Sequence, residues 1–326
     1  MVMENSHILL AHSAVDIMIK NKSEIESLKD KFAGKTLFII GNGPSLNITP
    51  LEELNSEYTL AMNKISHIYS ETSWRPSMFY FAMSPEHPEA PNDYSSENYI
   101  GKNINLDIPC FINSEYKSIV GEKNNAYYFD KFKLRGHNPF HQSSIKEINR
   151  MSVDQLQHFW SNNIKHHIYH YHTIYGAIQT AVFLGFKQIY LIGCDLGMEY
   201  TNPHMIFESG MDPYRYQKNA WRYIMESAKK GNLGRSICNA TAMELILNLD
   251  FINRLEFLSK EDNKHFTSEY LDSIDIDDGI RVEKEIKKTH LAAKKICEKK
   301  GIKIYNATVG GELEIYDRKD IHSLIG

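Results

Sequence analysis

Short, mostly apolar runs alternate along this chain with longer segments in which apolar residues recur at helical spacing. The apolar runs cover residues 36–40, 58–62, 78–83, 188–192 and 302–305. Each has the length of a strand, and a continuous apolar run is typical of a strand buried on both faces of a parallel sheet. Because such strands alternate with helices, we predict an α/β fold with a doubly wound, Rossmann-like, mostly parallel sheet.

Apolar residues at helical spacing predict amphipathic helices between and after these strands. The predicted helices cover residues 14–32, 173–186, 211–230, 240–258 and 281–300. Gly34, Gly185 and Gly301 lie at the C-terminal ends of three of them, where glycine commonly closes a helix. Residues 90–163 are less regular, and we expect only short strands there, near 110–112 and 126–129.

The composition changes this picture little. The 326 residues are 42% hydrophobic and 24% charged, which is ordinary for a globular protein and excludes a disordered or fibrous chain. The 37 basic and 41 acidic residues give a net charge of −4, so no basic surplus points to nucleic acid. The apolar runs are too short for a transmembrane helix.

Two features of the sequence bear on the compartment. Glu4 and Asp16 accompany the N-terminal apolar residues, which argues against a signal peptide. The four cysteines are far apart and form no Cys-x-x-Cys pair, so neither a disulfide framework nor a zinc site is indicated. We therefore expect a cytoplasmic protein.

Polar residues follow several of the predicted strands, at the carboxyl ends where doubly wound sheets bind their ligands. The first set is Gly41, Asn42, Gly43, Pro44 and Ser45. Glycines let a backbone approach a phosphate, and a serine can cap the next turn and offer its hydroxyl. The set matches neither the Walker pattern nor the dinucleotide fingerprint. We favour nucleotide binding over the alternative, a tight turn that begins a capped helix.

Three more polar features follow later strands. Asn63 could contact a ribose or base, or only cap a turn. Gly193 and Asp195 could orient a sugar or a catalytic residue, or form a turn with a solvated carboxylate. The stretch 306–311 could belong to the site or form a turn.

Histidine and tyrosine are frequent, with 15 and 19 residues, and they concentrate at 166–172. This stretch leads directly into the helix that opens near Tyr175. Polar aromatic side chains can line an anion or sugar pocket, so we assign a pocket role to His172 and Tyr175. His166 and His167 are expected at the surface.

The order of these motifs resembles a known family. Residues 41–46, then Tyr175 and Gly176 opening a helix, then 189–195 resemble the family of motility accessory factor glycosyltransferases and archaeal 6-hydroxymethylpterin diphosphokinases. Residues 304–315 resemble the C-terminal end of the bacterial members of this family, and residues 262–266 resemble the Asn-His-Phe segment of these members. The layout is also similar to bacterial CMP-sialic acid-dependent sialyltransferases.

The resemblance implies a set of nucleotide-binding residues. They are Gly41, Asn42, Gly43, Pro44, Ser45, Asn63, Tyr175, Gly176, Gly193 and Asp195. By the same resemblance His172 and Tyr200 contact the phosphate or sugar. The chain departs from the sialyltransferase pattern at 172–175, which replaces Arg-x-x-Ser, and at Ser84, where an aspartate is expected after the third strand.

The resemblance also implies how the chain is divided into structural parts. We expect an N-terminal helical segment at 1–34 and a nucleotide-binding core at 35–204 and 280–326, with an insert at 85–165. Residues 205–279 would form a helical lid that contacts the acceptor. Such a Rossmann-like sheet with helical lid and insert segments is a variant of the GT-A arrangement.

The leading hypothesis is a glycosyltransferase that moves a sialic-acid-like, nonulosonic sugar from a CMP donor to a hydroxyl acceptor of a surface glycan or protein. His265 is the first candidate for the base, since histidine titrates in the useful range, with Glu269 and His204 as alternatives. No metal site and no cofactor are predicted.

Two rival functions remain. One is a pterin-alcohol diphosphokinase that uses ATP and Mg²⁺, which would need carboxylates for the metal. The other is a nucleotide-binding module without catalysis. Peripheral membrane contact and a homo-oligomer are left open.

Overall fold

The computed structural model describes residues 25–85, 95, 98–133, 139–164, 166–169, 172–196, 276–311 and 313–324. The predicted helices at 211–230 and 240–258 lie outside the described residues, as do most of the predicted N-terminal segment at 1–34 and of the predicted lid at 205–279.

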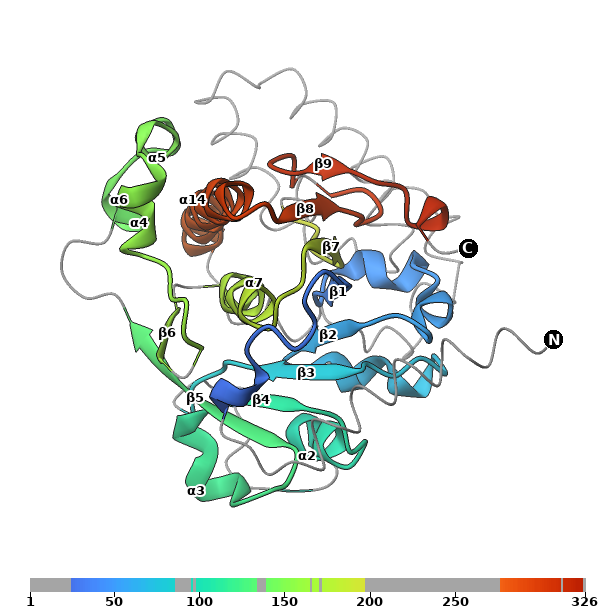
Figure 1. Cartoon of the computed structure of the whole chain (residues 1–326). Helices are drawn as coiled ribbons and strands as arrows, with labels where there is room; N and C mark the ends of the chain where they lie inside the picture. The colour runs from blue at the N-terminus through green and yellow to red at the C-terminus, as the bar shows by residue number, and fades with distance from the viewer. Residues whose placement is uncertain are drawn as a thin grey trace.

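Nine parallel strands form one sheet in the order β6-β5-β4-β3-β2-β1-β7-β8-β9 (Figure 1). The strands are β1 (Thr36–Ile40), β2 (Thr59–Met62), β3 (Met78–Phe81), β4 (Cys110–Asn113), β5 (Ala126–Lys133), β6 (His166–Tyr169), β7 (Gln188–Ile192), β8 (Lys303–Asn306) and β9 (Asp317–Arg318). The chain proceeds from β1 through β2 to β6 on one side and returns to place β7 on the other. This confirms the predicted doubly wound, parallel, Rossmann-like sheet.

The central strand β1 shows why its sequence is continuously apolar. Leu37 and Ile39 point into one hydrophobic cluster, and Phe38 and Ile40 point into the other. All four side chains are at most 2% exposed. A strand covered on both faces has no solvent side, so the usual alternation of polar and apolar residues is lost.

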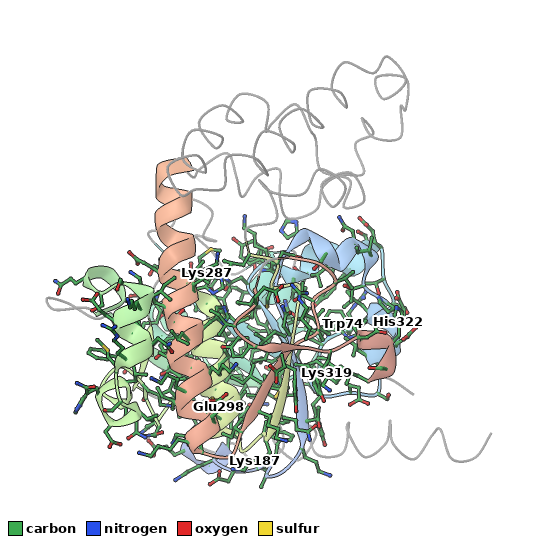
Figure 2. All side chains as sticks on the ribbon, turned by 90° about the horizontal axis from the view of Figure 1, so that it is seen from above. Trp74, Lys187, Lys287, Glu298, Lys319 and His322 are labelled. Carbon is green, nitrogen blue, oxygen red and sulfur yellow. The ribbon has the colours of Figure 1, made fainter. Side chains whose placement is uncertain are left out.

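Helices cover both faces of this sheet (Figures 1 and 2). The first face packs against η1 (Ile25–Leu28), α4 (Pro139–Gln142), α5 (Ile145–Arg150), α6 (Val153–Gln157), α7 (Thr173–Phe183) and α14 (Ile276–Lys299). The second packs against η2 (Pro44–Ile48), η3 (Leu51–Leu54), η4 (Ile65–Ser70), α2 (Tyr99–Ile104), η5 (Ser114–Tyr116), α3 (Lys117–Val120) and η6 (Ile321–Ser323). In Figure 2, α14 passes on one side of the sheet, while Trp74 and His322 lie on the other.

The second face is built mainly from short helices, and the link from β1 to β2 shows the reason. It contains two 3-10 helices, η2 and η3, instead of one α-helix. Pro50 stands between them as the N-cap of η3. Proline lacks the amide that a continuing helix needs, so the segment breaks there.

The region from 98 to 169 extends the same sheet. The strands expected near 110–112 and 126–129 are present as β4 and β5, and His166–Tyr169 forms the terminal strand β6. The histidine- and tyrosine-rich stretch is therefore in part a sheet edge.

Glycine is required where α7 turns toward β7. Gly185 has φ +95°, and a Cβ there would lie 2.9 Å from Asp30 Cα and 3.1 Å from Ala33 Cα. We expect Gly185→Ala to lower the free energy of unfolding, both by backbone strain and by displacing the segment that contains Asp30 and Ala33. Chemical denaturation measures this loss.

Gly301 offers a matched control, since it has φ +67° and an added Cβ would meet nothing within 4 Å. Gly301→Ala should lose only the cost of the left-handed backbone, about 1 kcal/mol. Equal losses for the two variants would contradict the packing reason given for Gly185.

Candidate functional site

The carboxyl ends of β1, β2, β7 and β8 carry the polar residues singled out in the sequence. The strand order turns back between β1 and β7, and the crevice at such a point is the usual ligand site of a doubly wound sheet. Most of the predicted residues within the described part of the chain follow these strands, while Tyr175 and Gly176 belong to α7. Four predicted residues, Tyr200, His204, His265 and Glu269, lie outside the described residues.

The loop after β1 packs tightly against the loop after β7. Gly41 and Gly43 donate their amides to Ile192 and Gly193 carbonyls at 2.7 and 2.9 Å. An added Cβ on Gly43 would lie 1.6 Å from Asp195 Oδ2. The glycines thus have a packing role that holds without any ligand, and a direct approach to phosphate stays a prediction.

Asp195 is the most perturbed carboxylate of this edge. It is 6% exposed, and burial raises its pKa to about 6, against opposing contacts with Ser45 and Arg318. The backbone amide of Ser45 donates to Oδ2 at 3.3 Å. Oδ1 is buried and has no hydrogen-bond partner in the described part of the chain. A carboxylate held this way is poised to change protonation near neutral pH, which is common in binding and catalytic sites.

Asn63 connects three elements at the end of β2. It adopts φ +47°, and its side-chain amide donates to Thr173 Oγ1 at 3.0 Å. Its Oδ1 accepts a hydrogen bond from the amide of Ala82 at 3.4 Å. Asn63 therefore ties β2 to the end of β3 and the start of α7, and neither of these contacts caps the turn that follows it; contact with a nucleoside stays a prediction.

The start of α7 faces this edge. His172 is its N-cap residue and makes no side-chain cap hydrogen bond. Burial lowers the pKa of His172 to about 4, so the imidazole is neutral at pH 7. Its Nδ1 is buried without a hydrogen-bond partner among the described residues. The N-terminus of a helix attracts anions through its unpaired amides and its dipole, so this end of α7 is suited to phosphate.

Tyr175 and Gly176 lie deeper than the sequence suggested. Tyr175 is 1% exposed, its hydroxyl donates to the Phe159 carbonyl at 2.7 Å, and its ring packs edge-on against Trp160. Gly176 is buried inside α7. The structure gives both residues a place in the core, and a direct ligand contact for either stays a prediction.

Asn42 adds another buried acceptor. Its amide nitrogen donates to the Met62 carbonyl at 3.1 Å, which links the ends of β1 and β2. Its Oδ1 is buried with no partner in the described segments. Asn42, His172 and Asp195 thus each offer one buried, unpartnered polar atom. Such atoms are rare in native proteins and need an explanation, of which a bound ligand or water is one.

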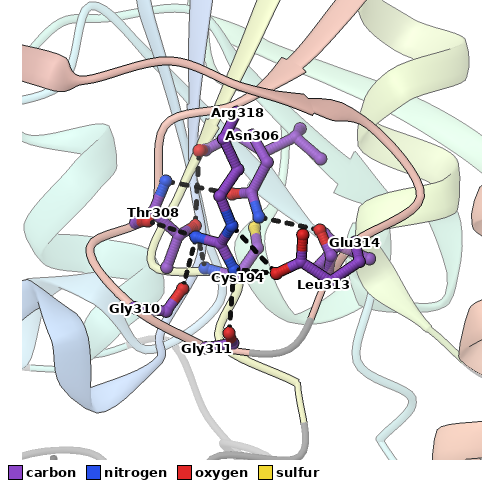
Figure 3. Close-up of polar contacts among 9 residues, drawn as sticks. Cys194, Asn306, Thr308, Gly310, Gly311, Leu313, Glu314 and Arg318 are labelled. Atoms are coloured by element: carbon purple, nitrogen blue, oxygen red, sulfur yellow. Dashed lines mark hydrogen bonds and ion pairs between the residues drawn. The ribbon is translucent and has the colours of Figure 1, made fainter.

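Arg318 organises the loop after β8, and sequence reasoning missed it (Figure 3). Its guanidinium donates to the carbonyls of Thr308, Gly310 and Gly311 at 3.2, 2.6 and 2.8 Å, and to Glu314 at 2.6 Å. A planar five-donor fork can collect several oxygens that a lysine could not. The only signal was an arginine shortly after a glycine pair, which is too common to be informative.

Thr308 joins this loop to the end of β7. Its Oγ1 accepts from the Cys194 amide at 3.1 Å, and its own amide donates to Asn306 Oδ1 at 3.0 Å. An added Cβ on Gly311 would lie 2.2 Å from the Asp195 carbonyl oxygen. The loop after β8 therefore lies against Asp195, so the stretch 306–311 belongs to the same edge.

Within the described ranges, no three histidine, cysteine, aspartate or glutamate residues are grouped so that they could hold a metal ion. Among the same residues, no helix is both long enough and apolar enough to cross a membrane.

The fold and site define the class of protein as an α/β Rossmann-like protein with a polar edge at the carboxyl ends of its strands. No protein-family model, curated protein or solved structure matches the chain. The resemblance to glycosyltransferases and pterin diphosphokinases therefore stays a prediction.

The raised pKa of Asp195 gives a pH-dependent test. The folded state holds the proton of Asp195 more tightly than the unfolded state does. The protonated carboxyl therefore contributes its full stability below about pH 4, and this contribution is lost as pH rises through about 6. Asp195→Asn stays neutral. We expect the variant to equal the wild type near pH 4 and to exceed it at pH 7 by on the order of 2–3 kcal/mol in free energy of unfolding.

Denaturant titrations of both proteins across pH 4–8 measure this difference. Taking the difference removes the opposite trend from His172, whose lowered pKa makes the protein gain stability as pH rises. A difference between the two proteins that stays constant with pH would contradict the raised pKa of Asp195.

Proposed function

We propose that this protein is a glycosyltransferase that moves a nonulosonic sugar from a CMP donor to a hydroxyl group of a glycan or protein. The observation that carries the proposal is the set of buried, unpartnered atoms Asn42 Oδ1, His172 Nδ1 and Asp195 Oδ1 around the point where the strand order turns back. Polar atoms left unpaired in a protein interior cost free energy, and a polar ligand can satisfy them.

The phosphate of CMP would lie between the loop after β1 and the start of α7. His172 contributes a neutral imidazole there, and α7 contributes the positive end of its dipole. The proposal needs no metal for this group, because CMP leaves as a phosphate monoester whose charge hydroxyl, amide and imidazole donors can meet. Asn63, one strand further along the edge, would lie beside the ribose.

The sugar would lie on the opposite side, toward β7 and β8. Asp195 can accept hydrogen bonds from sugar hydroxyls through Oδ1, and its protonated form can also donate one. Arg318 donates hydrogen bonds to the carbonyls of Gly310 and Gly311, so both carbonyls point toward Arg318. In this arrangement β7 and β8 supply the sugar contacts.

The reaction would be a direct displacement. The acceptor oxygen attacks the anomeric carbon, the bond from that carbon to the phosphate oxygen breaks, and CMP takes the bonding electrons. A base removes the acceptor proton. We assign this base to His265, with Glu269 and His204 as the alternatives, and acceptor recognition to the segments at 85–165 and 205–279.

Nucleotide binding separates this function from its rivals. We expect CMP to raise the melting temperature of the purified protein equally with and without Mg²⁺, and UDP and ATP to have much smaller effects. Thermal-shift titrations with CMP, CDP, UDP and ATP test this. Stabilisation by ATP only in the presence of Mg²⁺ would favour the diphosphokinase, and no stabilisation by any nucleotide would contradict the proposal.

Substitution of the base tests the chemistry. His265→Ala should abolish transfer from a CMP-sugar and leave the affinity for CMP unchanged, because the base acts on the acceptor. His322→Ala is the matched control, since His322 of η6 is exposed, lies beside Glu53 of η3 and is not among the predicted site residues, and it should retain activity. If His265→Ala keeps full activity, the role passes to Glu269 or His204, which the same assay then tests.

A further inference from the structure

Two histidines from distant parts of the chain meet beside the start of α7. His290 of α14 is 2% exposed, and its ring lies edge-on to the ring of His172, with the ring centroids 5.9 Å apart and the ring planes at 61°. His172 is the N-cap residue of α7, so the pair lies at the end of the helix where the proposed phosphate binds. His290 has no part in the function proposed above.

The hydroxyl of Tyr316 fixes the proton of His290. Tyr316 Oη lies 3.0 Å from the His290 carbonyl oxygen, and because a carbonyl only accepts hydrogen bonds, the phenol hydrogen points to it. His290 Nδ1 lies 3.1 Å from the same Tyr316 oxygen. The single phenol hydrogen is already used, so Nδ1 carries the hydrogen of this second bond. Burial holds the pKa of His290 well below its usual value, so the ring is neutral and Nε2 keeps a lone pair.

No carboxylate in the described part of the chain raises the pKa of either imidazole. Four other titratable side chains around the pair are neutral at pH 7, because burial raises the pKa of each. They are Tyr175 on α7, Cys194 after β7, Cys297 on α14 and Tyr316 itself. The charged groups that flank His290 on α14 or act on Tyr316 are Lys287, Lys294 and Glu298, of which Lys294 donates to the Ile315 carbonyl at 2.7 Å.

This pair has room for one further proton. His172 Nδ1 is buried without a hydrogen-bond partner among the described residues, and a protonated imidazole has an N–H on both nitrogens. A charge on His172 opposes a charge on His290, so the pair takes up one proton and not two. His172 is the ring at the end of α7, where a bound anion would favour its charged form.

We infer that His172 takes up one proton when a phosphate binds at the start of α7, and that His290 accepts a hydrogen bond from the imidazolium through Nε2. The proton comes from the solvent and returns to it when the phosphate leaves. His290 is a positioning residue, since it acts on the phosphate only through His172. The inference rests on the proposed function, because that function places a phosphate here.

The charge of the phosphate determines how far the pKa of His172 moves. An opposite charge within about 4–6 Å changes a pKa by about 1–3, so a bound dianion brings the pKa of His172 from about 4 to about 7. In the proposed transfer, the phosphate changes from a diester with one negative charge to a monoester with two. The proton is therefore held most tightly when the leaving group has gained its second charge.

Titration calorimetry counts this proton. CMP is titrated at pH 7 in two buffers with different heats of ionisation, and the difference between the observed heats gives the number of protons taken up. We expect the wild type to take up on the order of half a proton per CMP, because the pKa of His172 in the complex lies near this pH. His172→Gln keeps a side-chain donor but cannot titrate, so it should lose this uptake.

Two matched variants exclude other sources of the proton. Asp195→Asn removes the other group of this edge that titrates near neutral pH, and it should retain the uptake. His322→Gln replaces an exposed histidine and should retain the uptake as well. Nitrogen-15 NMR tests the same step in the wild type, where CMP at pH 6 should convert His172 from the neutral to the imidazolium form.

Substitution of His290 tests its positioning role. His290→Phe keeps a ring but has no lone pair, and should weaken CMP about fivefold at pH 6, the effect of one hydrogen bond to the charged His172. At pH 9, where His172 is neutral in the complex too, the substitution should have no effect. His290→Gln supplies an amide oxygen and should restore most of the affinity at pH 6. Equal losses at pH 6 and pH 9 would contradict the role of His290.

The outcomes separate this inference from the proposed function. If CMP binds without proton uptake, or if His172→Gln keeps the uptake, the inference is wrong and the nucleotide site stands. If CMP does not bind at any of these pH values, the proposed function fails and the inference fails with it. The melting temperature of each unliganded variant shows whether it is folded.

Discussion

The contact between the loops after β1 and β7 is the constraint on which the site depends. Gly41 and Gly43 lack side chains, so the two loops close to hydrogen-bond distance and Asp195 lies directly beside the first loop. This contact occurs where the strand order turns back, between β1 and β7 in the interior of the sheet. The buried side-chain oxygens of Asn42 and Asp195 lie around this contact, and so does the start of α7. The loop that Arg318 holds lies against Asp195 on the side of β8.

The site opposes stability, as binding sites often do. The hydrophobic clusters on both faces of the sheet fix the positions of the strands. These strands can then hold polar atoms buried without hydrogen-bond partners, although such burial costs free energy. Burial keeps His172 neutral and raises the pKa of Asp195. A ligand that supplies hydrogen bonds to these groups recovers free energy that folding alone does not.

The sheet could be predicted from the sequence because the central strands are buried on both faces. Leu37 to Ile40 form an uninterrupted apolar run, and such a run has few alternatives in an α/β chain. The 3-10 helices after β1 could not be predicted as such, since their short apolar spacing also suits an α-helix. The position of Tyr175 in the core was missed, because its partner, the Phe159 carbonyl, belongs to a separate segment. Arg318 was missed for the same reason: it donates to carbonyls that only the fold brings near.

The central claim is that this edge of the sheet binds the CMP part of a nucleotide sugar, and a crystal structure of the protein with CMP tests it most directly. The account predicts the phosphate between the loop Gly41 to Ser45 and the start of α7, and the ribose beside Asn63. CMP bound away from the carboxyl ends of β1 and β7 would contradict it.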